Sequence, residues 1–156
     1  MMDILIGIVC LVALIALKSA MGHRAQRRFT IAWEEAQVEI ARGNHESAMV
    51  HVADCVRLMP LWLPPRFLLG SLLARHGKLA EAEEQYKMAQ ALQPREAVGY
   101  VELGIFYITM ANRVDEGITQ LREALAHDAS ALQKIESDPR LREFRDSPAY
   151  GTLEQR

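Results

Sequence analysis

Hydrophobic residues are distributed along this chain in two different ways. Near the N-terminus they form one unbroken run, Ile4 to Leu17, in which Cys10 is the only residue with a polar side chain. From residue 29 onwards apolar and polar residues are mixed, and the mixture recurs along the chain. No stretch shows the strict alternation of a half-buried β-strand. The pattern therefore predicts an all-α chain with one apolar segment in front.

The apolar run predicts a membrane anchor. With its flanks it extends over residues 1–22, and about 20 residues are enough to cross the apolar core of a bilayer. A signal peptide and a buried core helix are the alternatives. A signal peptide is the weaker explanation, because the sequence opens Met-Met-Asp instead of with positive charge. Lys18 also stands where a cleavage site needs a small residue.

Charge around the run predicts how the anchor is oriented. Lys18, Arg24, Arg27 and Arg28 follow the run, and residues 23–28 form a basic juxtamembrane segment. The positive-inside rule places that side in the cytoplasm and the N-terminus outside. Residues 1–28 carry four Lys or Arg against one Asp, net +3, while residues 29–156 carry 14 against 19, net −5. We therefore expect a single-pass protein of the bacterial inner membrane, in contact with lipid through residues 1–22.

The rest of the chain repeats itself every 34 residues. Leu69 and Gly70 recur as Leu103 and Gly104, 34 positions later. The same spacing relates Gly43 to Gly77, Ala48 to Ala82, Leu58 to Leu92, and Pro60 to Pro94. A fixed period of this length is the signature of a repeat protein. The third copy gains one residue near Asn112.

At these positions the chain resembles the tetratricopeptide repeat (TPR) family. The residues that carry the resemblance are Gly43, Ala48, Pro60, Leu69, Gly70, Gly77, Ala82, Tyr86, Ala89, Pro94, Leu103, Gly104 and Tyr107. The resemblance implies a short solenoid of three helical hairpins over residues 29–62, 63–96 and 97–130. Small residues let paired helices approach, large ones fill the space between, glycine caps the first helix of each pair, and proline stops the second.

The expected helices span residues 29–42, 45–58, 65–76, 79–92, 97–111 and 114–127, and residues 131–156 are expected to form short capping helices. An end repeat needs such a cap, because its outer face has no neighbour. Asp138-Pro139 and Ser147-Pro148 each predict a helix start, with an N-cap residue followed by proline. The side chains expected to fold back on the third repeat are Leu132, Ile135, Leu141, Phe144, Tyr150 and Leu153.

The resemblance also implies a partner-binding groove lined by the first helix of each pair. Its expected residues are Trp33, Gln37, Ile40, Phe67, Ser71, Arg75, Val101, Ile105 and Ile108. This surface is apolar enough to accept an amphipathic helix or an extended peptide. The alternative is that another part of the chain fills the groove. Some family members clamp acidic chaperone tails, but the matching positions here, Trp33, Gln37, Leu68, Val98 and Glu102, hold no positive charge.

Composition removes several classes of function. A net charge of −2 argues against binding nucleic acid through bulk charge. Two cysteines are too few for a disulfide framework, and His51 with Cys55 supplies too few ligands for zinc. Glu81, Glu83 and Glu84 are expected to form a solvated face. No nucleophile or phosphate-binding motif is recognisable, so we expect no cofactor, no metal and no enzyme activity.

These features together favour a membrane-anchored scaffold or adaptor that recruits or assembles a membrane complex. The layout is similar to that of the lipopolysaccharide assembly protein B family, which has more repeats and a metal knuckle that this chain lacks. An accessory structural subunit of a larger membrane enzyme, a mitochondrial-type import receptor and a regulator of a protease or kinase are the alternatives.

Overall fold

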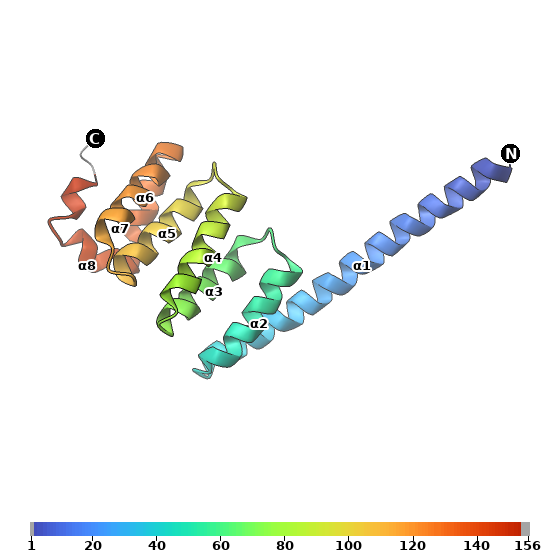
Figure 1. Ribbon diagram of the computed structural model, residues 1–156, viewed down its shortest axis with the longest axis horizontal. Coiled ribbons are helices and arrows are strands. Elements are labelled where there is room, and N and C mark those ends of the chain that lie inside the picture. The colour runs from blue at the N-terminus through green and yellow to red at the C-terminus, as the bar shows by residue number, and fades with distance from the viewer. Residues whose placement is uncertain (1, 154–156) are drawn as a thin grey trace. The chain divides into compact units, whose positions relative to one another are not determined.

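The computed structural model describes the backbone of residues 2–153 and the side chains of residues 22–153. Every regular element in this part of the chain is helical, so the predicted all-α class is confirmed. The elements are α1 Met2–Ala41, α2 His45–Leu58, α3 Leu63–Arg75, α4 Leu79–Leu92, α5 Ala97–Thr109, α6 Val114–His127, α7 Ala131–Ser137, η1 Pro139–Leu141, α8 Arg142–Arg145 and η2 Tyr150–Thr152 (Figure 1).

Residues up to Pro60 form one compact unit, and residues from Leu61 form a second. The boundary falls two residues before the predicted boundary between the repeats 29–62 and 63–96. Among the helical residues with described side chains, no helix is long and apolar enough to cross a membrane. The anchor predicted for residues 1–22 lies almost wholly outside this part, because side chains are described only from Gly22 onwards.

The first unit is a helical hairpin of α1 and α2 (Figure 1). Small side chains allow the two helices to pack closely, since Ala36, Ala48 and Cys55 are all fully buried. Gly43 ends α1 with a φ of 79°, a left-handed conformation that glycine adopts without strain. Residues 29–41 continue directly from the preceding turns of α1, as the absence of proline between 18 and 28 predicts.

The second unit contains two further hairpins, α3 with α4 and α5 with α6. The helices keep the 34-residue spacing, because α1, α3 and α5 end at residues 41, 75 and 109. Likewise α2 and α4 span residues 45–58 and 79–92. The predicted start of α3 at residue 65 is wrong by two residues, because Pro64 and Pro65 lie in its first turn, where proline needs no amide hydrogen. The last two residues predicted for α5 lie outside the helix.

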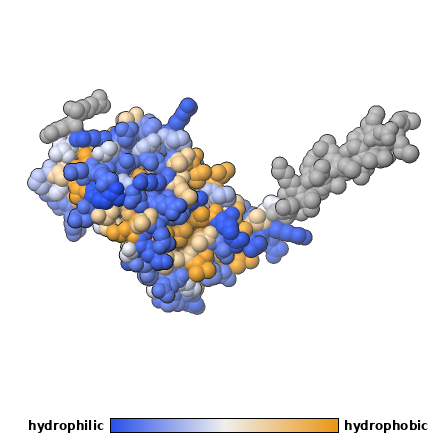
Figure 2. All heavy atoms as spheres, in the orientation of Figure 1, coloured by the Kyte–Doolittle hydropathy of each residue, from blue (hydrophilic) through white to orange (hydrophobic). Residues whose placement is uncertain are grey.

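Glycine at the helix contacts is required by space. A Cβ on Gly70 would lie 2.9 Å from a ring carbon of Tyr86, and one on Gly104 would lie 2.8 Å from a methyl carbon of Leu121. The remaining TPR-like apolar positions of this unit are also buried, namely Leu69, Ala82, Tyr86, Ala89, Leu103 and Tyr107. Hydrophilic residues accordingly cover most of the visible face of this unit in Figure 2.

The turn of the third hairpin is one residue longer than the other two, as the sequence predicts. Residues 42–44 and 76–78 connect the first two helix pairs, whereas residues 110–113 connect α5 to α6. Asn112 takes a φ of 54°, and it is the one non-glycine residue of the described backbone with positive φ. Asparagine tolerates this conformation better than most residues, so it replaces the glycine of the other turns.

The C-terminal segment folds against α5 and α6, as expected. Ile135, Leu141, Phe144 and Leu153 are buried in one cluster with residues of both helices, and Tyr150 packs at its edge. Leu132 does not join the cluster, so that prediction is wrong. Ala131 occupies the buried position one residue earlier on α7.

Only one of the two predicted helix starts in this segment is present. Asp138 accepts a hydrogen bond from the Arg140 amide at 2.9 Å, with Pro139 in the first turn of η1. Ser147-Pro148 starts no helix, since the last helix begins at Tyr150 with Ala149 as its N-cap. The Ser147 hydroxyl instead donates backwards to the Phe144 carbonyl at 2.7 Å, so it closes the preceding turn.

Candidate partner-binding surface

In the first unit, the predicted groove residues differ in how accessible they are. Gln37 is exposed, while Trp33 and Ile40 are half-buried. The Trp33 ring stacks on Phe29 with 6.2 Å between ring centres, and it packs against the cluster that Phe29 forms with Cys55. Trp33 is therefore partly a core residue, although some of its surface remains open.

In the second unit, the predicted residues on α3 are accessible. Arg75 is exposed, and Phe67 and Ser71 are half-buried. The Phe67 ring stacks on Tyr86 at 6.3 Å, and Tyr86 stacks in turn on Phe106 at 5.0 Å. The stack therefore extends from α3 through α4 to α5, and Phe67 is its half-buried end.

On α5 the predicted groove is covered by the chain itself. Val101 and Ile105 are 5% and 2% exposed, and both belong to the cluster formed with α7, η1 and α8. The prediction that these two residues are open to a partner is therefore wrong. Ile108 is half-buried at the edge of the same cluster, and its side chain lies over Gly117. On α5 the alternative therefore holds, because the C-terminal segment of the chain fills this part of the groove.

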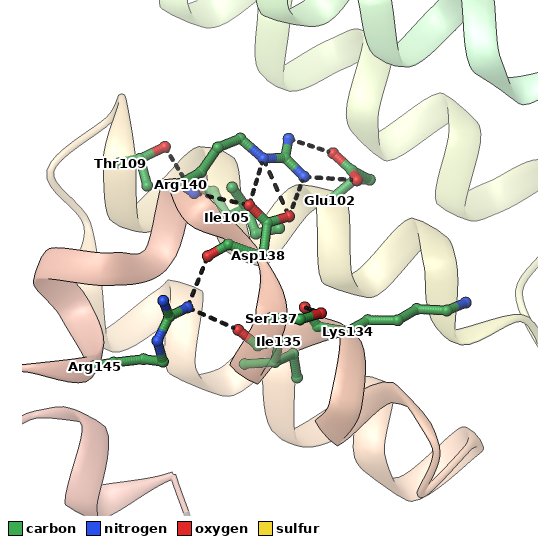
Figure 3. Close-up of polar contacts among 9 residues, drawn as sticks. All are labelled: Glu102, Ile105, Thr109, Lys134, Ile135, Ser137, Asp138, Arg140 and Arg145. Atoms are coloured by element: carbon green, nitrogen blue, oxygen red, sulfur yellow. Dashed lines mark hydrogen bonds and ion pairs between the residues drawn. The ribbon is translucent and has the colours of Figure 1, made fainter.

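An ion-pair network fastens the covering segment to α5 (Figure 3). Arg140 donates to both carboxylate oxygens of Glu102, at 2.9 and 3.0 Å, and it also binds the Asp138 carboxylate at 2.7 Å. Hydrogen bonds from Arg140 hold the pKa of Asp138 below its usual value, although burial opposes them. Arg145 donates to the backbone carbonyls of Asp138 and Ile135, at 2.7 and 3.3 Å. Glu102 is also one of the positions that match the chaperone-tail clamp of some TPR proteins. Because it is an acid already bound by an arginine, it argues further against such a clamp.

The Tyr86 hydroxyl lies in this region, and its oxygen is not among the fully buried side-chain atoms that lack a partner. Tyr86 is only 4% exposed, and its oxygen forms no hydrogen bond within residues 22–153. Burial, together with the negative charge of Glu102, raises the pKa of Tyr86 to about 12, while the charges of Arg140 and Arg75 oppose the shift. The hydroxyl therefore stays protonated at neutral pH and can donate a hydrogen bond.

Glu83 is not part of a solvated face, so that prediction is wrong. Its carboxylate accepts hydrogen bonds from the Tyr107 hydroxyl at 2.8 Å and from Arg113 at 2.6 Å, and it pairs with Lys87 at 2.7 Å. Burial raises the pKa of Glu83, but the hydrogen bonds from Lys87, Tyr107 and Arg113 outweigh it and bring the value to about 2. Arg113 also lies 4.4 Å above the centre of the Tyr107 ring. These contacts join α4 to α5 and to the turn that follows α5.

His51 and Cys55 contact different parts of the first hairpin and do not form a common site. The His51 ring nitrogen lies 3.1 Å from the Glu35 carboxylate of α1, and Cys55 is fully buried in the hairpin core. Burial, and then the nearby charge of Asp54, raises the pKa of the Cys55 thiol. Among the residues with described side chains, no three potential metal ligands come together.

No protein-family model matches this chain, and no curated protein matches it significantly. The repeat pattern predicts Phe67, Ser71 and Arg75 as groove positions, and all three are at least partly accessible. It predicts no contact for Lys134 or Arg140, because the repeat period does not extend into the C-terminal segment.

Proposed function

We propose that this protein is a membrane-anchored scaffold of the TPR type, which binds a protein partner and recruits or assembles a membrane-associated complex. The observation that carries the proposal is the 34-residue recurrence of whole helices. Helix ends at residues 41, 75 and 109 repeat at the same spacing as the TPR-like residues of the sequence. Stacked hairpins of this kind present extended surfaces that bind other proteins.

The anchor is supported by what lies on either side of residue 22. The sequence before it contains the uninterrupted apolar run from Ile4 to Leu17. The side chains of Arg24, Arg27 and Arg28 after it are exposed, and none forms an ion pair within the described residues. Such a basic segment beside an apolar one favours a span with the repeats in the cytoplasm of a bacterium.

The binding surface in this proposal is the accessible part of the predicted groove in the second unit. It comprises Phe67, Ser71 and Arg75 on α3. A partly exposed aromatic ring and an exposed arginine on the same helix favour protein recognition, since these residue types dominate binding energies at interfaces. We propose a binding role without catalysis.

The test is a mild-detergent pull-down of the tagged full-length protein, with mass spectrometry of the proteins that come with it. An adaptor is expected to bring substoichiometric partners that are lost in Phe67→Glu and kept in Val50→Glu. The control introduces the same charge at a residue of α2 that is 64% exposed. Equal loss in both variants, or no partner in any sample, would overturn the proposal.

A second candidate is an accessory subunit built permanently into a membrane enzyme. It is favoured by Ile31 and Val38 on α1, which are 53% and 46% exposed and lie seven residues apart on the helix face opposite Phe29 and Ala36. The equivalent positions of α5, Gly99 and Phe106, are buried, and Gly99 packs on Gln90 of α4. A subunit of this kind is expected to bring stoichiometric proteins that are lost in Val38→Glu.

A further inference from the structure

Three arginines of α1 lie immediately before the first hairpin. Arg24, Arg27 and Arg28 are all exposed, and the next residue, Phe29, is the first buried one among the described side chains. The arginines belong to the same helix as the apolar run of the sequence, because α1 extends from Met2 to Ala41 without a break (Figure 1). Their side chains therefore lie between that run and the packed part of the first unit.

Among the described side chains of the first unit, no acid neutralises these three arginines, since none of them forms an ion pair there. The first acid after them on α1 is Glu34, which is six residues and about 9 Å further along the helix axis. On α2, Asp54 precedes Cys55, whose thiol contacts the Phe29 carbonyl, but the Asp54 carboxylate is bound by Arg57 at 2.8 Å. Three guanidinium charges are therefore available to an anionic ligand.

The position of the arginines along the helix corresponds to the depth of lipid phosphates, if residues 1–22 form the proposed anchor. About 20 helical residues cross the apolar core of a bilayer, so the core ends near residue 22. At 1.5 Å per residue, Arg24 and Arg28 then lie about 3 and 9 Å beyond the edge of the core. The headgroup layer on each side of a bilayer is about 5–8 Å thick, so the three charges fall within it or at its outer edge.

We propose that Arg24, Arg27 and Arg28 form a binding site for the headgroups of anionic phospholipids. Spacings of three and four residues put the side chains on one side of the helix, where they contact the same patch of the lipid surface. Each guanidinium donates two parallel hydrogen bonds to a phosphate group, a geometry that arginine provides and lysine does not. The protein thereby collects anionic lipids around its span. This inference rests on the proposed membrane anchor and adds a lipid ligand to the protein partner.

The test is native mass spectrometry of the full-length protein in a neutral detergent, after incubation with equal amounts of phosphatidylglycerol and phosphatidylcholine that carry the same acyl chains. The wild type is expected to bind phosphatidylglycerol at least about tenfold better, since each basic residue near an anionic lipid surface strengthens binding roughly fivefold. With Arg24→Gln, Arg27→Gln and Arg28→Gln combined, the two lipids are expected to bind equally. Detergent solution removes any effect of the substitutions on the orientation of the span.

The matched control combines Arg95→Gln, Lys134→Gln and Arg142→Gln, which remove the same three charges from exposed positions of the second unit. The preference for phosphatidylglycerol is expected to stay unchanged in this variant. Equal binding of the two lipids by the wild type, or equal loss of the preference in both triple variants, would overturn the inference.

Extraction of membranes with alkaline carbonate tests the anchor separately. If the full-length protein stays in the membrane pellet but shows no lipid preference, the proposed anchor stands and the inference fails. If the protein is released into the supernatant, the anchor is overturned, and the inference fails with it, because the depth of the arginines depends on the span. The pull-down with Phe67→Glu decides the partner-binding role in either case.

Discussion

Arg140 and Glu102 are joined by two parallel hydrogen bonds, 2.9 and 3.0 Å long, between one guanidinium and one carboxylate. Arg140 lies in η1 and Glu102 in α5, so the pair connects the C-terminal segment to the helix that it covers. The same guanidinium binds Asp138, the residue that starts η1. The Arg140 side chain therefore stabilises both the turn at the start of η1 and the contact of the C-terminal segment with α5.

Replacing Arg140 should loosen this segment. Arg140→Ala is expected to lower the free energy of unfolding by about 1–2 kcal/mol, a modest value because the side chain is 45% exposed. Arg140→Lys keeps the charge but not the two-pronged geometry, so about half of the loss is expected to remain. Urea unfolding followed by circular dichroism measures both variants. Identical midpoints for Arg140→Ala and the wild type would show that the pair contributes nothing.

Glu83 should make stability depend on pH in acid. Its pKa is about 2 in the folded chain against 4.5 for the free group, so the folded state binds the proton less readily than the unfolded state. The stabilisation is complete above about pH 4.5 and disappears as the pH falls through about 2. We expect a contribution of about 2 kcal/mol at neutral pH.

Glu83→Gln isolates this contribution, because it removes the charge and keeps the shape. The difference in unfolding free energy between the wild type and this variant should be large at pH 7 and shrink as the pH approaches about 2. Glu84→Gln is the control, since Glu84 is the exposed neighbour on the same helix. A difference that does not change with pH would contradict the assignment.

Ile105 should behave as a core residue and not as part of a binding surface. Ile105→Ala removes a side chain that is 2% exposed, and it is expected to lower the free energy of unfolding by about 2–4 kcal/mol. Ile31→Ala makes the same change where the side chain is 53% exposed, and less than about 0.5 kcal/mol is expected. Thermal unfolding of both variants gives the comparison. Equal losses would mean that the C-terminal segment does not cover α5.

Asn112 should accept glycine more readily than alanine. Its φ of 54° strains most side chains, so Asn112→Ala is expected to destabilise the protein by about 1 kcal/mol. Asn112→Gly is expected to leave stability within about 0.5 kcal/mol of the wild type, because glycine adopts this φ freely. Chemical unfolding at fixed temperature measures the order. A more stable alanine variant would exclude the left-handed turn.

The sequence predicts the hairpins well because their determinants are local or periodic. Gly43 and Gly77 end first helices with positive φ, and α2 and α4 each end two residues before Pro60 and Pro94. The additional residue near Asn112 could also be predicted, because the register of small residues shifts after it. The copies of a repeat can be compared with one another within one sequence, so a single chain is enough to find the period.

The candidate surface could be predicted only in part, because it depends on contacts between segments far apart in sequence. Val101 and Ile105 match groove positions by spacing, yet residues some 30 to 40 positions later cover them. Glu83 looks like one acid among three on α4, yet Tyr107 of α5 and Arg113 of the turn after α5 bind it. Neither relationship has a periodic signature. The helix start predicted at Ser147-Pro148 is wrong for a different reason. A serine hydroxyl can bind a carbonyl of the preceding turn as readily as it caps the next helix.

The longer turn at residues 110–113 has a consequence for how this protein can change its length. Duplication of a 34-residue stretch taken from residues 29–109 adds one complete hairpin and returns every later residue to its place in the period. A 34-residue duplication that crosses the turn falls one residue short, and one residue rotates a helix by about 100°. In steps of 34 residues, growth and shrinkage by recombination are thereby confined to residues 29–109, while a step that includes the longer turn needs 35 residues.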